Sequence, residues 1–74
     1  MGQVITNARF EEVYDQIIGK LYDQETLEDV LNTCTEAFDV IDMVKEVEGL
    51  SSAMYKELCT MVYMVKNEAL ETFK

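Results

Sequence analysis

The chain contains few residues that would interrupt a helix, because it has no proline and only three glycines among its 74 residues. Proline breaks helix interiors and glycine weakens them, so their scarcity favours long helices. A chain of this length supports one small domain and buries only a modest share of its surface. We therefore expect a single helical domain over residues 1–74, with residues 1–5 frayed, whose core is either very efficient or shared with a partner.

Apolar residues recur at helical spacing in three segments, about 7–22, 27–48 and 52–73. Each segment has one continuous apolar stripe with members at i, i+3, i+4 and i+7, the pattern of an amphipathic helix. The stripes consist of Phe10, Val13, Tyr14, Ile17, Ile18 and Leu21 in the first segment, Leu27, Val30, Leu31, Cys34, Phe38, Ile41 and Val44 in the second, and Met54, Leu58, Met61, Val62, Val65, Ala69 and Phe73 in the third. The sequence thus predicts an all-α fold of three helices.

The residues at the segment ends are typical of helix caps. Thr6, Thr26 and Ser51 can each accept a hydrogen bond from a backbone amide of the first turn, and Gly49 can take the positive φ that ends a helix. The connections between the segments are short, which makes successive helices antiparallel neighbours. We expect a small antiparallel three-helix bundle, in which the first helix is too short to cover the whole hairpin formed by the other two.

Charge is distributed unevenly along the chain, which has 15 acidic and 6 basic residues and a formal net charge of −9. Nine of the acidic residues lie between positions 23 and 48, where Lys45 is the one basic residue. Such a chain is repelled by nucleic-acid phosphates and by anionic membranes, so we expect no direct binding to either. A basic surface of another protein would attract it.

Six of these acids project opposite the apolar stripe of segment 27–48 at ~100° per residue, namely Glu28, Asp29, Glu36, Asp39, Asp42 and Glu46. One interpretation is a solvated face that keeps the chain soluble. The other is a strip that docks on a basic protein surface, with Glu36, Asp39, Asp42 and Glu46 making the contact. A narrower version is nucleic-acid mimicry, in which carboxylates occupy phosphate positions on an enzyme. Carboxylates one helical turn apart repeat every ~5.4 Å and occupy only one face, and both features weaken the mimicry version.

Several apolar residues lie outside the stripes. Residues 61–65 are all apolar and cover the full circumference of a helix, so Tyr63 and Met64 point away from the stripe. Met43 lies among the carboxylates of the preceding segment. Single exposed apolar residues are normal, but Met and Tyr are also common in protein contacts. We predict a contact surface for another protein or for a second copy, and expect a homodimer that completes a four-helix or six-helix core.

In an antiparallel hairpin that turns at Gly49, the two cysteines would lie at different heights along the two helices. Cys34 and Cys59 would be offset by ~9 Å along the helix axes, which is too far for a disulfide. We expect both to be reduced, small core residues, as is typical of a cytoplasmic protein.

The chain lacks the residues that most catalytic sites need. It has no histidine, which excludes Ser-His-Asp and Cys-His systems and zinc sites with histidine ligands. The pairs Glu12-x-x-Asp15 and Glu36-x-x-Asp39 loosely resemble the acidic pairs with which all-α nucleotide pyrophosphohydrolases of the MazG type hold Mg²⁺. That resemblance implies a Mg²⁺-dependent hydrolase. However, the first pair ends in Asp where the family has Glu, and both pairs point away from the core. We expect no catalytic activity, metal or cofactor.

The sequence therefore predicts a cytoplasmic, non-catalytic, acidic helical protein that acts by binding another protein. An adaptor, an inhibitor or a small regulatory protein, including one encoded by a phage or mobile element, would fit. The second hypothesis is a nucleic-acid-mimicking inhibitor of a DNA- or RNA-binding enzyme that acts through the acidic face of the second helix. The third is the Mg²⁺-dependent nucleotide hydrolase.

Overall fold

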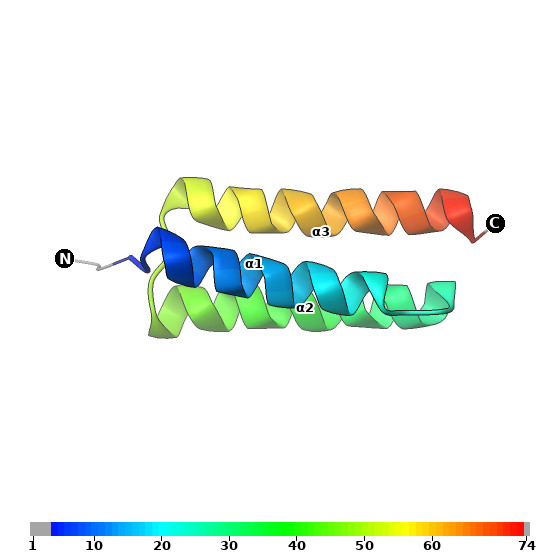
Figure 1. Ribbon diagram of the computed structural model, residues 1–74, viewed down its shortest axis with the longest axis horizontal. Helices are drawn as coiled ribbons and strands as arrows, with labels where there is room; N and C mark the ends of the chain where they lie inside the picture. Colours follow the sequence, from blue (N-terminus) through cyan, green and yellow to red (C-terminus); the bar gives the residue numbers. More distant parts are fainter. Residues whose placement is uncertain (1–3, 74) are drawn as a thin grey trace.

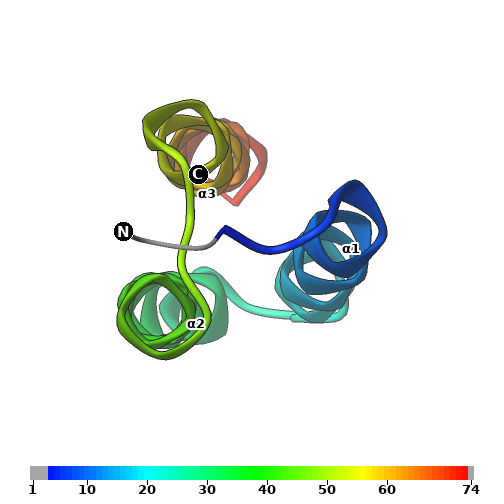
Figure 2. The same ribbon diagram turned by 90° about the vertical axis from the view of Figure 1, so that its left-hand side faces the viewer.

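The computed structural model describes residues 4–73, and three helices make up that range: α1 (Asn7–Tyr22), α2 (Leu27–Val47) and α3 (Ser52–Thr72). They run up, down and up along a rod of 45 × 17 × 17 Å (Figure 1). Viewed from one end, the helices lie at the corners of a triangle, and each packs against both others (Figure 2). The predicted three-helix bundle is confirmed for the described residues.

Each helix begins at the cap that the sequence predicts. The side-chain hydroxyls of Thr6, Thr26 and Ser51 each accept a hydrogen bond from the backbone N–H three residues later, at 3.1, 3.2 and 3.1 Å. At the end of α2, Gly49 has a φ of 94° and donates its N–H to the carbonyl of Val44 at 2.9 Å. A side chain is strained at such a φ, so glycine fits this turn. All helix boundaries fall within one residue of the predicted ones.

The segment before α1 is anchored at Ile5 rather than frayed there. The Ile5 side chain is buried in the core, and its backbone N–H donates to the carbonyl of Gly49 at 3.0 Å. Burial of an isoleucine and a satisfied backbone pair together hold this residue against the turn between α2 and α3. The frayed segment expected over residues 1–5 therefore does not include Ile5, and residues 1–3 lie outside the described residues.

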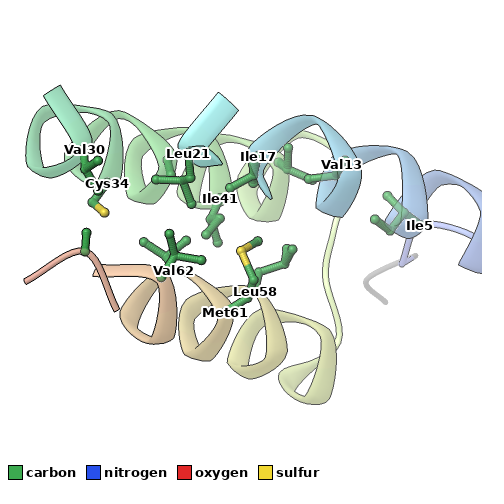
Figure 3. Close-up of a cluster of buried hydrophobic side chains, with 14 residues drawn as sticks. Ile5, Val13, Ile17, Leu21, Val30, Cys34, Ile41, Leu58, Met61 and Val62 are labelled. Carbon is green, nitrogen blue, oxygen red and sulfur yellow. The ribbon is translucent and has the colours of Figure 1, made fainter. Parts of the chain in front are cut away.

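The core is a line of apolar side chains that runs between the three helices (Figure 3). Ile41 of α2 and Leu58 and Val62 of α3 are completely enclosed at its centre. The buried residues are Val13, Ile17 and Leu21 on α1, Val30, Thr33, Cys34, Ala37, Ile41 and Val44 on α2, and Leu58, Met61, Val62, Val65 and Ala69 on α3.

The buried face of α2 is turned toward α1 relative to the predicted stripe. Thr33 and Ala37 are buried, whereas Leu31 and Phe38 are only half-buried. The two small residues share a groove with Ile17 of α1, where short side chains let a neighbouring helix approach closely. The bulkier Leu31 and Phe38 consequently lie toward α3, at the edge of the core. This rotation leaves apolar surface of α2 at the outside of the bundle.

The short α1 does not cover the far end of the hairpin formed by α2 and α3. Near its last turn lies a hollow of about 280 Å³, whose apolar walls include Leu21, Val30, Val65 and Ala69. Tyr22 and Glu68 meet at the side of this hollow, where the tyrosine hydroxyl donates to the carboxylate at 3.2 Å.

Candidate protein-contact surfaces

The triangular bundle has three outer faces, one between each pair of helices, and the three apolar residues singled out from the sequence lie on different faces. Tyr63 packs its ring against Phe38 of α2, with ring centroids 5.1 Å apart. Met64 shares a groove with Tyr14 of α1. Met43 lies on the outward side of α2, and all three are exposed, with exposed fractions of 54%, 65% and 56% for Tyr63, Met64 and Met43. These residues do not form one patch.

The four carboxylates predicted to dock on a partner are all exposed on α2, and we call them the carboxylate strip: Glu36, Asp39, Asp42 and Glu46. Around the circumference of α2, Glu36 and Asp42 lie at the two edges of the strip, with Asp39 and Glu46 between them. Both edge residues interact with other residues of the chain. Glu36 lies 3.8 Å from the Nζ atom of Lys20, and Asp42 accepts a 3.1 Å hydrogen bond from the hydroxyl of Tyr55. In the centre, Asp39 and Glu46 make no ion pair or side-chain hydrogen bond with any residue in 4–73.

The hydrogen bond to Asp42 changes the chemistry of Tyr55. It raises the pKa of the Tyr55 phenol, because the carboxylate favours the protonated hydroxyl that donates to it. The ammonium group of Lys45 lies 4.4 Å from the centroid of the same ring, a cation–π contact. Tyr55 thus joins the α3 side of the hairpin to the edge of the carboxylate strip.

A second feature of α2 is a line of exposed apolar residues next to the carboxylate strip. Val40, Met43 and Val47 are 38%, 56% and 77% exposed. They are spaced by three and four residues, so they follow one side of the helix. We call this line the apolar ridge. It lies on the side of α2 that faces α1, since Val40 borders the groove that also contains Ile17.

The basic residues of α1 that border this face are already paired. Arg9 donates to both carboxylate oxygens of Glu48, from Nε at 2.8 Å and from a terminal nitrogen at 2.9 Å. A terminal nitrogen of Arg9 also lies 3.3 Å from Glu12. The hydrogen bonds from Arg9 lower the pKa of Glu48 and keep its carboxylate charged. Because Lys20 faces Glu36 as well, this face has little positive charge to offset the carboxylate strip.

The face between α2 and α3 carries a third feature, which we call the apolar seam. It consists of Leu27, Leu31 and Phe38 from α2 and of Cys59, Tyr63 and Leu70 from α3. At ~100° per residue, the members on each helix fall within an arc of about 40°. Tyr63 and Leu70 are 54% and 41% exposed, and the other four are half-buried. The seam is therefore an uncovered apolar surface that two helices share.

Sequence reasoning placed Leu31 and Phe38 in the core and did not identify the ridge. The helical pattern alone is compatible with Leu31 and Phe38 being either buried or half-buried. A stripe more than 100° wide does not show which of its edges a neighbouring helix covers. The spacing of Val40 and Val47 around Met43 was a signal that could have revealed the ridge.

The cysteines are both free, as predicted. Cys34 is buried, and burial raises the pKa of its thiol. Cys59 is half-buried on the apolar seam. Neither thiol belongs to a metal-binding cluster, since residues 4–73 contain no group of three or more cysteine, aspartate or glutamate side chains that could hold a metal ion. The acidic pairs at positions 12/15 and 36/39 accordingly do not converge on one site.

Comparisons with known proteins add no family to this description. No protein-family model, curated protein or solved structure matches the chain. In the part of the chain that the structure describes, no helix has the length and apolarity needed to cross a bilayer.

Proposed function

We propose that the chain is a non-catalytic cytoplasmic protein that binds a basic surface of another protein through the carboxylate strip and the adjoining apolar ridge. The observation that carries this proposal is the position of Met43 and Val47, which are 56% and 77% exposed, beside Asp39 and Glu46, which have no ionic partner among residues 4–73. An exposed apolar line next to unpaired charge offers both parts of a protein contact.

The two parts would contribute differently to binding. Burial of an exposed Val or Met side chain contributes up to about 1.5–3 kcal/mol before the costs of association are subtracted. The carboxylates would accelerate encounter with a basic partner and fix the register, and salt would weaken this effect. An adaptor or an inhibitor of modest size can act in this way without any catalytic group.

The alternative, nucleic-acid mimicry, is supported by the same carboxylates but gives no role to the ridge. A mimic presents charges where phosphates would lie, and an apolar line beside them has no counterpart on a nucleic-acid backbone. The exposure of Met43 and Val47 therefore favours a protein surface that combines basic and apolar groups over a phosphate-binding channel.

The test compares two variants that have the same net charge. Asp39→Asn/Glu46→Gln alters the strip, and Glu11→Gln/Asp15→Asn alters exposed residues of α1; each changes the formal charge from −9 to −7. Wild type and both variants are immobilised and incubated with extract of the source cells at low and high salt, and captured proteins are quantified by mass spectrometry. We expect proteins that wild type and the α1 variant retain, that the strip variant loses, and that salt releases.

Two results would contradict the proposal. Equal losses with both variants would mean that the overall charge, rather than the strip, attracts the captured proteins. Equal capture by all three proteins would mean that the strip is not a contact surface. A further variant, Met43→Ala, keeps every charge and is expected to weaken capture through the loss of apolar contact alone.

A further inference from the structure

We propose that the part of the partner protein that contacts the carboxylate strip and the apolar ridge is a basic amphipathic α-helix. This inference rests on the proposed function, because it names the kind of partner that the same surface of α2 would bind. Three properties of the surface support a helical partner: its heptad spacing, the way the bundle closes one of its sides, and the charges around it.

The apolar ridge and the centre of the carboxylate strip follow one heptad repeat. Val40, Met43 and Val47 have the spacing of heptad positions a, d and a. Asp39 and Glu46 each directly precede one of the valines and therefore occupy position g. In a coiled coil, the a and d residues pack on a second helix, and charged g residues pair with side chains at its flank. Because all three ridge residues are exposed, neither α1 nor α3 is that second helix.

The bundle closes the side of the ridge that lies away from the strip. Position e of the repeat is Val44, which is buried in the core. On the same side, Val40 borders the groove that also contains Ile17 of α1. A helix that docks along the ridge would therefore lie with the bundle at one flank and the carboxylates at the other, in a contact of about two turns.

The charges around the ridge require a basic helix. The two carboxylates at position g have no ionic partner among residues 4–73 and lie ~10 Å apart along α2. At one end of the ridge, Lys20 is already paired with Glu36. At the other end, Arg9 is paired with Glu48. The incoming helix thus meets uncompensated negative charge, and Lys or Arg residues seven positions apart on it would face both carboxylates.

An extended segment would fit this surface less well than a helix. Residues 4–73 form helices and contain no strand whose edge an added strand could extend. The backbone of an extended segment on valine and methionine side chains would leave N–H and C=O groups without partners. Polyproline segments dock on aromatic side chains, and the ridge has none. A helix forms its own backbone hydrogen bonds and can bury one side against the ridge without this cost.

The first experiment uses synthetic peptides as probes. One peptide has three heptads with leucine at positions a and d, lysine at e and g, and alanine elsewhere; its lysines repel one another and so oppose pairing of the peptide with itself. A second peptide has the same residues in an order without helical periodicity. We expect the heptad peptide to bind at least about 10-fold more tightly than the reordered one in an NMR titration, and to shift the amide signals of residues 40–47.

The second experiment exchanges the charges. Asp39→Lys/Glu46→Lys alters the strip and Glu11→Lys/Asp15→Lys alters α1, and each changes the formal charge from −9 to −5. The strip variant should lose affinity for the lysine peptide and gain affinity for a peptide with glutamate at e and g, because opposite charges then meet again. The α1 variant should show smaller changes with both peptides. Circular dichroism checks that each variant keeps its helicity.

Three results would overturn the helical partner: equal affinities for the heptad and the reordered peptide, no binding of the heptad peptide at about 1 mM, or a strip variant that behaves like the α1 variant. The capture experiment with cell extract separates these failures from failure of the proposed function. If capture still depends on the strip, the surface binds a protein in another conformation. If that dependence is lost as well, the proposed function fails together with this inference.

Discussion

The enclosed position of Ile41 allows a quantitative prediction for the core. The Ile41 side chain has no exposed surface and lies among other enclosed residues such as Leu58 and Val62. Ile41→Ala removes three carbon atoms from this site, which costs the lost burial and leaves a cavity, together about 2–5 kcal/mol. A domain of 74 residues has a total stability of roughly 4–11 kcal/mol, so the loss is a large share of it.

Leu31→Ala is the informative comparison, because the apolar pattern places Leu31 and Ile41 in the same stripe. In the structure Leu31 is only half-buried at the seam, so we expect its truncation to cost less than half as much. Urea denaturation followed by circular dichroism measures both free energies of unfolding. The measurements belong at one low protein concentration, since any self-association would add a concentration-dependent stabilisation. Equal costs for the two variants would refute the rotation of α2 toward α1.

Two further predictions concern titratable groups. Because Arg9 lowers the pKa of Glu48, this pair stabilises the fold above the ordinary glutamate pKa of 4.5 and stops doing so as the pH falls through the lowered value. The melting temperature of Glu48→Gln should therefore lie below that of wild type at neutral pH and match it in strong acid; a difference that persists there would contradict this account. Burial raises the pKa of Cys34 and blocks access to it, so at low protein concentration Ellman's reagent should modify Cys59 first. Loss of the fast phase of this reaction in Cys34→Ser rather than in Cys59→Ser would show that Cys34 is the more reactive thiol.

Local features of the fold could be predicted from the sequence because they depend on neighbouring residues. The caps at Thr6, Thr26 and Ser51 and the turn at Gly49 involve contacts within a few positions, and all four are confirmed. The anchoring of Ile5 could not be predicted in the same way, because its hydrogen-bond acceptor is the carbonyl of Gly49, at the other end of two helices.

The surfaces were harder to predict because they depend on how the helices are placed around one another. Helical phase indicated that Tyr63 and Met64 lie outside the stripe of α3, and both are exposed. It could not show that Tyr63 faces Phe38 whereas Met64 faces the side of Tyr14. Those contacts depend on where α1 packs, and α1 packs beside the small residue Ala37. Helical periodicity does not show that a neighbouring helix packs on a small residue rather than on its larger apolar neighbours.

The odd number of helices makes this rod directional. The chain passes along it three times, so the start of α1 and the end of α3 lie at opposite tips (Figure 1). The rod therefore has two unlike poles, one where Ile5 meets the turn at Gly49 and the other where α3 ends. Dyes attached to the two poles would be separated by nearly the 45 Å length of the rod, and energy transfer between them would report that separation. Molecules tethered to the two poles would be held apart at a fixed span.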